Sequence, residues 1–466
     1  MLIERFEDKG LSHYSYAVGC EGAGEVVIVD PRRDVDVYLD FAHARNLRII
    51  GILETHIHAD FASGTTALAE ATGATVHASA YDQGQLYETA FDHAPMREGD
   101  AITMGKTRVE ALHTPGHTPE HLSFLVYDLA RAASVPQLLL SGDFLFVGSL
   151  GRPDLIGEDV KRELAGRLYD SVADKLGPLP DFVEVHPAHG AGSMCGSGMS
   201  ARPMTTLGFE RVANPYLRKG LSRQGFIDEI LGQVPPFPPY YKRMKVLNAR
   251  GAVPFDAGKD LEPVRAKQFH QLVADGHVVI DLRDQLAYGA GHIPGSFGIG
   301  SWGSLSTWAA WVVPYETPIL LVGARDEPFG EAVRALARVG LDDVRGCLDG
   351  GLEKWIAAGY PVTHVRQLTP AEFVEVRRDA PMHVVDVRAA DEWNSGHISG
   401  ARHIMGGLLA ERLTELPRRG TLAVVCASGY RSTVAASVLE RAGFDDVVNI
   451  TGGMAAWAHA GLPVEK

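Results

Sequence analysis

Short apolar runs alternate with amphipathic stretches over the first third of the chain, a pattern that predicts strands separated by helices. The clearest helical pattern covers residues 158–176. The predicted strands cover residues 24–31, 47–56, 107–114, 121–128, 136–146 and 181–189. Strands that alternate with helices in this way are typical of a layered α/β domain.

The pattern changes at a proline-rich stretch, QVPPFPPYYKR, which begins at residue 233 and cannot continue a helix or a central strand. Beyond it the chain repeats itself: residues 277–299 match 383–404, and residues 348–362 match 450–464. A period near 100 residues is too long for a solenoid repeat and indicates two tandem domains. We therefore predict the following divisions: a domain at 1–235, a linker at 236–259, and domains at 260–364 and 366–466.

The start of the last domain has its own local prediction. Thr369-Pro370-Ala371-Glu372 has the sequence of a capping box, with proline at the first helical position. A helix is therefore expected to begin here.

Composition narrows the possible functions. The 466 residues include 44 Lys and Arg against 58 Asp and Glu, which gives a net charge of −14. Such a chain repels phosphate backbones and anionic lipid, so we expect no nucleic-acid and no membrane partner. The four cysteines cannot build a disulfide framework, and no apolar stretch reaches the length of a membrane span. We expect a cytoplasmic protein; a homo-oligomer is compatible with the sequence.

Histidine and aspartate follow the ends of four predicted strands. The segments are THIHADF (55–61), HTPGH (113–117), GD (142–143) and HPAH (186–189). A single histidine at a strand end is usually structural, but loops on one edge of a layered domain converge. Imidazole and carboxylate are the usual ligands of zinc and non-haem iron, so these four segments together predict a metal site.

In this order the motifs HxHxD, HTPGH, SGD and HPAH resemble the metallo-β-lactamase fold, an αββα sandwich, over about residues 1–235. SGDFLFVGSLGRPDL and HPAHG resemble more specifically its persulfide dioxygenase branch, to which glyoxalase II-type hydrolases are close relatives. Those hydrolases hold two metals on HxHxDH, whereas this chain has Phe61 at the last position. Because a phenyl ring donates no lone pair, we expect one metal rather than two.

The resemblance implies a ligand set. Carried over by motif, one Fe(II) per chain is held by His56, His117 and Asp143, with positions open for substrate sulfur and O2 and with no organic cofactor. Three further residues would surround these ligands or remain from a second metal site: His58, Asp60 and His189. His58 could also bind the metal, which the sequence leaves open.

Two more residues near these motifs are candidates. Arg152, in GRPDL, matches an arginine that in the resembling family faces the anionic thiol carrier; the alternative is a surface salt bridge. Cys195 lies in the glycine-rich loop GAGSMCGSG and could relay sulfur from a substrate persulfide. Its alternative role is that of a small buried hydrophobe.

A cysteine loop lies near the C-terminus. Residues 422–443 have the pattern of a strand, a six-residue loop that begins at Cys426, and a helix. The residues expected to bind substrate in this loop are Ala427, Ser428, Gly429 and Tyr430, followed by Arg431. Inward N–H groups and a helix N-terminus stabilise a thiolate, and they also bind anionic persulfide, sulfite or thiosulfate.

With DVR, GHISGA and GGMAAWAHAGLPV around the loop, this domain resembles a rhodanese over its whole length. The resemblance implies that Cys426 accepts sulfur and that Arg431 acts with it. Asp386, Arg388 and His397 are interpreted mainly as support for the loop. The preceding repeat has Gly323 in place of the cysteine and Pro328 in place of the arginine, so we expect it to be inactive.

The order of the three domains resembles a bacterial persulfide dioxygenase–sulfurtransferase fusion that acts in sulfide detoxification. It implies oxidation of a low-molecular-weight thiol persulfide by O2 to sulfite, and transfer of sulfane sulfur through Cys426 between persulfide, sulfite and thiosulfate. One alternative is a glyoxalase II-like, metal-dependent thioester hydrolase fused to a thiosulfate sulfurtransferase. Another makes the C-terminal half a sulfur carrier or docking module. The sequence leaves open the thiol carrier, the direction of transfer and the oligomeric state.

Overall fold

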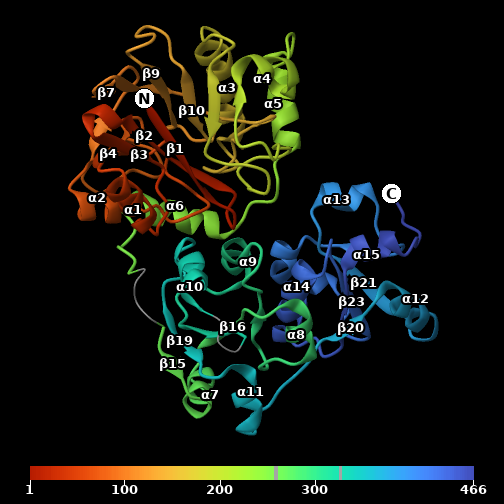
Figure 1. Ribbon diagram of the computed structural model, residues 1–466. Coiled ribbons are helices and arrows are strands. Elements are labelled where there is room, and N and C mark those ends of the chain that lie inside the picture. Colours follow the sequence, from red (N-terminus) through yellow and green to blue (C-terminus); the bar gives the residue numbers. More distant parts are fainter. Residues whose placement is uncertain (257–260, 325–327) are drawn as a thin grey trace. The chain divides into compact units, whose positions relative to one another are not determined.

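The computed structural model describes residues 1–256, 261–324 and 328–466 (Figure 1). The chain forms two compact units: one of Met1–Ala257 with Ala337–Gly340, the other of Gly258–Leu336 with Leu341–Lys466. No helix of the described residues has the length and apolar character needed to cross a membrane.

The first unit contains two six-stranded sheets. The first sheet has the order β1 (Leu2–Asp8), β2 (His13–Cys20), β3 (Glu25–Val29), β4 (Arg48–Leu53), β5 (Thr75–Ser79) and β6 (Ala94–Met96). The second has the order β14 (Thr205–Thr206), β13 (Glu184–Pro187), β10 (Leu138–Gly142), β9 (Leu122–Asp128), β8 (Thr107–His113) and β7 (Ala101–Met104). A short hairpin joins β11 (Leu145–Phe146) to β12 (Ser149–Leu150).

The two sheets pack face to face. Successive residues of a strand point to opposite sides, so one strand can contribute both to the layer between the sheets and to an outer layer. Val27 and Val29 of β3 lie in the layer between the sheets, together with Phe124 of β9. Val26 and Ile28, the residues between them in sequence, lie in the apolar layer on the outer side of the first sheet. Both faces of β3 are therefore buried, as its unbroken apolar run predicts.

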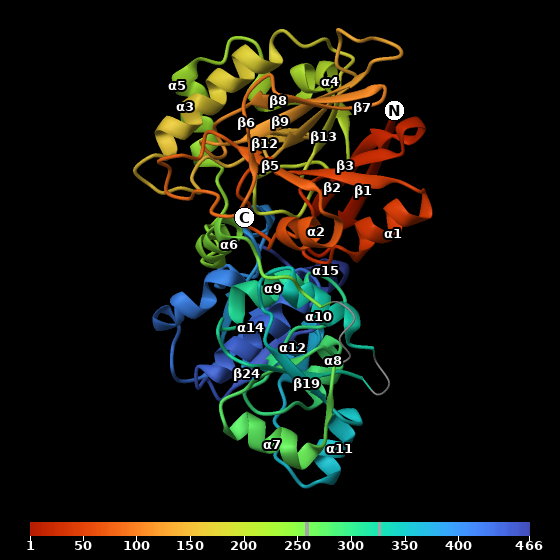
Figure 2. The ribbon, with the colours of Figure 1, turned by 90° about the vertical axis from the view of Figure 1, so that its left-hand side faces the viewer.

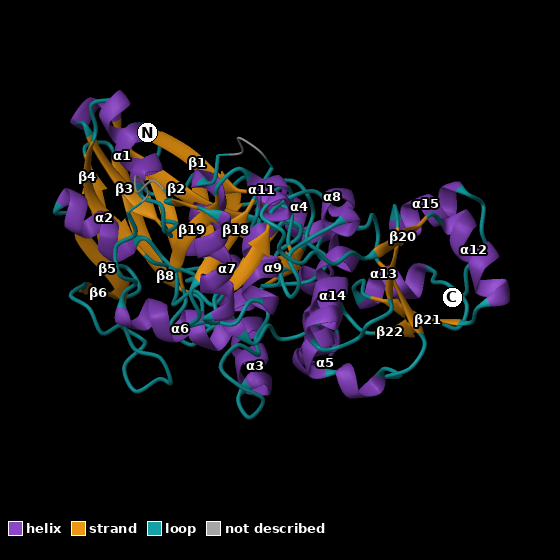
Figure 3. Ribbon diagram, turned by 90° about the horizontal axis from the view of Figure 1, so that it is seen from below, coloured by secondary structure: helices purple, strands orange, loops and turns teal. Residues whose placement is uncertain are grey.

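Helices cover the outer faces of both sheets (Figures 2 and 3). α1 (Asp36–Ala44) and α2 (Thr65–Thr72) contribute to the apolar layer on the first sheet. α3 (Lys161–Ser171) and α5 (Arg223–Gly232) contribute to the layer on the second, and α4 (Leu207–Ala213) follows β14. The order helix, sheet, sheet, helix confirms the predicted αββα sandwich.

The segment expected to be a linker differs from the expectation. Residues 240–250 of the 236–259 segment form α6 (Tyr240–Arg250), a helix of the first unit with six buried residues. The proline-rich stretch ends at Pro239, and the buried residues after it recur with helical spacing. The end of the predicted linker, residues 257–259, and the first residue of the next predicted domain lie outside the described residues.

The second unit repeats one topology twice, as the sequence repeat predicts. One five-stranded sheet has the order β15 (Pro263–Val264), β19 (Val344–Leu348), β18 (Ile319–Val322), β16 (Val278–Asp281) and β17 (Phe297–Gly298). The other has the order β20 (Arg366–Leu368), β24 (Val447–Ile450), β23 (Thr421–Val425), β21 (Met382–Asp386) and β22 (Arg402–His403). All pairings in both sheets are parallel.

Helices connect the strands in both halves. In the first half they are α7 (Ala266–Ala274), α8 (Gln285–Ala290), α9 (Leu305–Val312), α10 (Gly330–Ala337) and α11 (Gly351–Ala357). In the second half they are α12 (Pro370–Asp379), α13 (Ala390–Ser395), α14 (Tyr430–Arg441) and α15 (Gly453–His459). α12 begins with the predicted capping box, in which Thr369 and Glu372 exchange hydrogen bonds.

Candidate metal centre and cysteine loop

Strand ends bring the predicted metal ligands together. His56 follows β4, His117 follows β8, and Asp143 follows β10. All three side chains are buried, and one ligand atom from each lies within 4.8 Å of the other two. Asp143 Oδ2 is 3.4 Å from His117 Nε2 and 3.8 Å from His56 Nε2. The structure therefore groups the three residues that the motifs indicate.

Hydrogen bonds on the far side of each ring turn a lone pair toward this centre. The hydroxyl of Thr55 donates to Asp30, so it can only accept from His56 Nδ1, 2.9 Å away. His117 Nδ1 lies 2.9 Å from the carbonyl oxygen of Arg152, which can only accept. In both rings the proton is consequently on Nδ1 and the lone pair on Nε2, the arrangement of metal-binding histidines.

The three inward atoms are suited to a divalent cation. Within the described parts of the chain, His56 Nε2, His117 Nε2 and Asp143 Oδ2 are buried and have no hydrogen-bond partner. Buried polar atoms without partners are costly, and one metal ion would satisfy all three at once. Two imidazoles and one carboxylate also form the ligand set of non-haem Fe(II) sites with open positions. The residues present therefore fit the expected metal.

Asp143 is held from two sides. Its Oδ1 accepts from His189 Nδ1 at 2.6 Å, and its backbone N–H donates to His121 Nε2 at 3.0 Å. His121 is a buried residue of the segment predicted only as a strand, and the sequence analysis missed it. A third histidine in HTPGHTPEH was the available signal. Both histidines act by orienting the carboxylate toward the centre.

His189 lies between two carboxylates. Its Nε2 is 2.7 Å from Asp60 Oδ2, on the side opposite to Asp143. Burial alone lowers the pKa of His189, but Asp143 and Asp60 outweigh it and raise that pKa to about 10. The ring is thus an ionic bridge between the two carboxylates. His189 thus contacts one of the three ligands and Asp60 contacts His189, and both belong to a separate group with Cys195.

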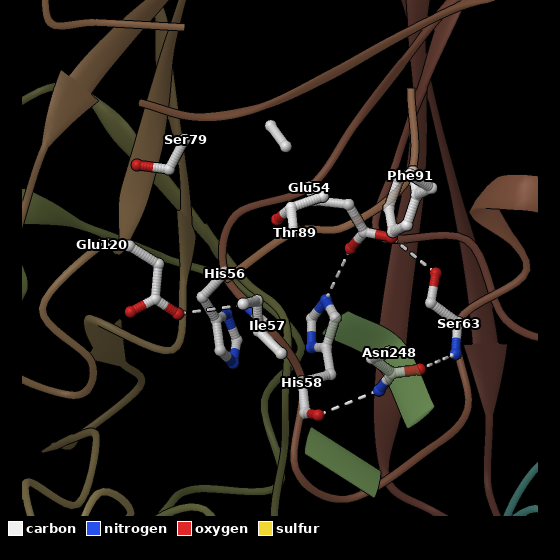
Figure 4. Close-up of a pocket in the computed structure, with 11 residues that line it drawn as sticks. Glu54, His56, Ile57, His58, Ser63, Ser79, Thr89, Phe91, Glu120 and Asn248 are labelled. Atoms are coloured by element: carbon white, nitrogen blue, oxygen red, sulfur yellow. Dashed lines mark hydrogen bonds and ion pairs between the residues drawn. The ribbon is translucent and has the colours of Figure 1, made fainter. Parts of the chain in front are cut away.

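His58 belongs to an acidic pair rather than to the three ligands. Its Nε2 is 3.0 Å from Glu54 Oε2 and 3.1 Å from Asp30 Oδ1. Burial lowers the pKa of His58, but Asp30 and Glu54 outweigh it and raise that pKa. Figure 4 shows Glu54 between His58 and the hydroxyl of Ser63, which donates to it. Sequence analysis missed Glu54, although it stands two residues before His56.

The small cavity drawn in Figure 4 lies beside His56 and His58. Its free space is about 20 Å³, enough for a water molecule and far too small for a thiol carrier. Substrate therefore needs another approach to the centre.

Phe61 occupies the position of the absent histidine. It is completely buried, with its ring 4.1 Å from that of His13 and 4.5 Å from that of His58. His13 was not singled out from the sequence; it is buried and has no hydrogen-bond partner among the described residues. Phe61 thus places an apolar wall where a second metal would need a nitrogen ligand.

Phe61→His is expected to raise the metal bound per chain from about one equivalent toward two. The change adds a ring nitrogen at the residue after Asp60, and Asp60 and His189 already offer ligand atoms to a second metal. Metal analysis of the purified variant after equilibration with zinc or iron would measure the change. An unchanged stoichiometry would contradict this explanation of Phe61.

In the second unit, Cys426 follows β23 at the base of its predicted loop. The residue is fully buried, and its Sγ accepts from the N–H of Gly429 at 3.0 Å and lies 3.4 Å from Ser432 Oγ. Gly429 has φ +108, and a Cβ there would meet the side chain of Gln285 at 2.9 Å. Only glycine fits this turn, which aims its N–H at the sulfur.

The other loop residues lie as the sequence places them, between Cys426 and α14. Ser428 is exposed, and its carbonyl oxygen lies 3.4 Å from Gln285 Nε2. Tyr430 donates to the carbonyl oxygen of Gly300 at 3.2 Å. Gln285 and Gly300 belong to the first repeat, which has Gly323 at the position of Cys426, and sequence analysis did not identify their contribution.

The guanidinium of Arg431 is paired with a carboxylate. Its guanidinium binds Glu392 with two contacts of 2.6 and 2.7 Å. Burial raises the pKa of Glu392, but Arg431 outweighs it and lowers that pKa. Arg431 therefore follows the loop as a member of an ion pair with Glu392. Sequence analysis missed Glu392 because it lies 39 residues earlier.

Two of the residues interpreted as support for the loop, Asp386 and Arg388, bind each other. Arg388 binds Asp386 with two nitrogens, and one of them also donates to the carbonyl oxygen of Gly396 at 2.8 Å. Arg283 repeats this arrangement on Asp281 and Gly291 in the first half. That half has Gly323 after β18; residues 325–327 of its degenerate loop lie outside the described residues.

Comparisons with known families agree with this geometry. The model of the metallo-beta-lactamase superfamily matches residues 8–189, and that of the rhodanese-like domain matches residues 265–358 and 369–460. A metallo-beta-lactamase structure from Staphylococcus aureus is 32% identical, with a TM-score of 0.67. The match covers 75% of this chain and 99% of the staphylococcal chain.

The chain belongs to the metallo-β-lactamase superfamily and carries two rhodanese-like domains. Its metallo-β-lactamase domain is 28% identical to mouse mitochondrial persulfide dioxygenase ETHE1, across 49% of this chain and 79% of that protein. A hydroxyacylglutathione hydrolase from Polaromonas is 31% identical, across 41% of this chain and 66% of the hydrolase. The predicted family and fold class are thereby confirmed.

Arg152 of the metallo-β-lactamase domain is not the surface salt bridge that sequence analysis weighed, and it does not present a free fork to a carrier. It is buried, and all five of its N–H donors have acceptors. Two contacts reach Asp154, and the others reach the carbonyl oxygens of Met194, Pro235 and Pro236. With all of its donors used within the protein, Arg152 ties together three segments around the centre.

Cys195 belongs to the same group of possible ligand atoms as Asp60 and His189. Burial, followed by the charges of Asp60 and Asp143, raises the pKa of its thiol. Its Sγ is 3.7 Å from the hydroxyl of Tyr241 on α6. A raised pKa disfavours the thiolate, which is the nucleophilic form, and the relay role of Cys195 stays a prediction.

The sequence resemblance implies persulfide-dependent O2 uptake, and we predict that Cys195→Ser changes this activity by less than about threefold, because a buried thiol with a raised pKa is a poor nucleophile. Oxygen-electrode rates of wild type and variant at equal iron content provide the measurement. A loss of tenfold or more would restore the relay role.

Proposed function

We propose that the metallo-β-lactamase domain oxidises a low-molecular-weight thiol persulfide with O2 to sulfite at one Fe(II) per chain. The observation that carries this proposal is the group His56, His117 and Asp143, with three inward ligand atoms and with Phe61 in place of a second-metal ligand. The similarity to a persulfide dioxygenase supports the same assignment.

The protein residues around the centre hold and orient the three ligand side chains. When bound there, Fe(II) would supply a Lewis-acid centre with positions for both the persulfide sulfur and O2. Thr55 and the Arg152 carbonyl fix the two rings, while His189 and His121 fix the carboxylate. Burial of all three ligand side chains keeps bulk water away from the reacting atoms.

We further propose that Cys426 transfers sulfane sulfur. A Cys426 persulfide would pass its outer sulfur to sulfite: the S–S bond breaks, a bond to the sulfur of sulfite forms, and Cys426 leaves as thiolate with thiosulfate as the product. The reverse step would load Cys426 from thiosulfate. The Gly429 N–H and the charge of Arg431 support the anionic sulfur in either direction. Having both activities on one chain raises the local concentration of the intermediate.

A thioester hydrolase remains the second candidate, because Asp60 and His189 are retained and the Polaromonas hydrolase is 31% identical. Metal analysis of the purified protein and an O2-uptake assay with glutathione persulfide decide between them. The dioxygenase proposal expects iron and O2 uptake with sulfite release. Zinc in two equivalents with thioester cleavage and no O2 uptake would overturn it.

A further inference from the structure

We infer that Lys245 of α6 binds the anionic sulfur or oxyanion of the substrate beside the metal centre. The inference rests on the proposed function and adds to it a residue that recognises the charge of the reacting group. It comes from a helix that sequence analysis interpreted as part of a linker.

α6 lies directly against the segment that carries the metal ligands. Lys245 Nζ donates to the carbonyl oxygen of Ile57, the residue after His56, at 2.7 Å. One turn later, Asn248 Nδ2 donates to the carbonyl oxygens of His58 and Phe61 at 2.9 and 2.7 Å. Figure 4 shows Asn248 beside His58 and Ser63. The bonds of Asn248 already hold α6 against this segment, so Lys245 is not required for that contact.

The ammonium group of Lys245 has unused hydrogen-bonding capacity. The residue is only 1% exposed, and Nζ has three N–H donors, of which one binds Ile57. The ring of Tyr87 lies 5.6 Å away, and no carboxylate of the described chain forms an ion pair with Nζ. Arg152, the buried cation described above, has no spare N–H donor. Lys245 therefore differs from it in being able to accept a further anionic partner.

Burying an ammonium without an ionic partner is costly, so its position needs a reason. Burial lowers the pKa of Lys245, and the charge of Glu120 is the largest of the acidic contributions that oppose this shift. The bond from Nζ to the Ile57 carbonyl holds the ammonium next to the ligand His56.

The proposed substrate and product match such a group. A thiol persulfide ionises to an anion on its terminal sulfur, and sulfite is an oxyanion. An ammonium with free N–H donors next to the ligand segment would hold either one in the water-excluded site, where a charge-assisted hydrogen bond is strong. A neutral thioester carbonyl would gain less from it.

Lys245→Met, which keeps the length of the aliphatic stem and removes the charge, tests the inference in the full-length, iron-loaded protein. We expect iron per chain and the circular dichroism spectrum to stay at wild-type values. KM for glutathione persulfide and the inhibition constant of sulfite should both rise about tenfold to a hundredfold, the usual range for one hydrogen bond to a charged group. Lys245→Arg should recover most of this loss.

Lys242→Met is the matched control, because Lys242 is exposed on the same helix; it should leave both constants unchanged. If Lys245→Met does not fold, Lys245→Gln, which keeps a donor for Ile57 without the charge, takes its place. Unchanged constants, or loss of iron in proportion to activity, would overturn the inference. If the wild type takes up no O2, the proposed function fails, and calorimetric binding of sulfite to iron-loaded wild type and Lys245→Met still decides the role of Lys245.

Discussion

His56→Ala is expected to leave a folded protein that retains little iron and loses O2 uptake by at least about a hundredfold. The substitution removes one of three ligand atoms and leaves His117 Nε2 and Asp143 Oδ2 as an incomplete set. Second-layer contacts alone change metal affinity by about tenfold to a hundredfold, so loss of a direct ligand should cost more. Iron analysis, circular dichroism and oxygen-electrode rates measure the three expectations.

His113→Ala is the matched control, because His113 stands in the same HTPGH motif but stacks on Tyr81 and binds the carbonyl oxygen of Pro119. It should keep its iron and its O2 uptake. Asp143→Ala should behave like His56→Ala and should in addition deprive His189 of one carboxylate partner. Full activity in either His56→Ala or Asp143→Ala would show that these residues do not hold the metal.

Cys426→Ser is expected to abolish sulfur transfer from thiosulfate and to leave persulfide-dependent O2 uptake at the wild-type rate. A serine hydroxyl is almost wholly protonated at neutral pH and cannot hold a sulfane sulfur. The metal ligands all lie in the metallo-β-lactamase domain, which has its own core. The variant should therefore release sulfite where the wild type makes thiosulfate, as sulfur-anion chromatography would show.

Cys347→Ser provides the matched control for this experiment: Cys347 is a buried cysteine in β19 of the first rhodanese-like domain. It should change neither activity. If O2 uptake in Cys426→Ser falls as steeply as sulfur transfer, Cys426 takes part in the oxidation itself and the two activities are not separable.

The sequence by itself determined the architecture and indicated three candidate metal ligands. Strand and helix periodicity predicted β3, β4, β8, β9, β10, β13 and α3. β3, β9 and β10 are buried on both faces, whereas β8 alternates between buried and half-buried residues. The repeat predicted two tandem domains after the proline-rich stretch, and the motifs at strand ends predicted the grouping of His56, His117 and Asp143. All of these features depend on local pattern or on topology, which short segments encode.

The tertiary structure alone decided what surrounds those ligands. Glu54 and Asp30 bind His58, Glu392 binds Arg431, and the donors of Arg152 are all used within the protein. Glu54 is near His58 in the sequence, but other partners lie up to 84 residues apart, where sequence pattern does not pair them. The same holds for α6: the prolines before it indicate a break, yet Lys245 and Asn248 contact Ile57 and His58 across about 190 residues. Packing, which depends on the whole folded domain, is the physical reason that these contacts could not be inferred from sequence pattern.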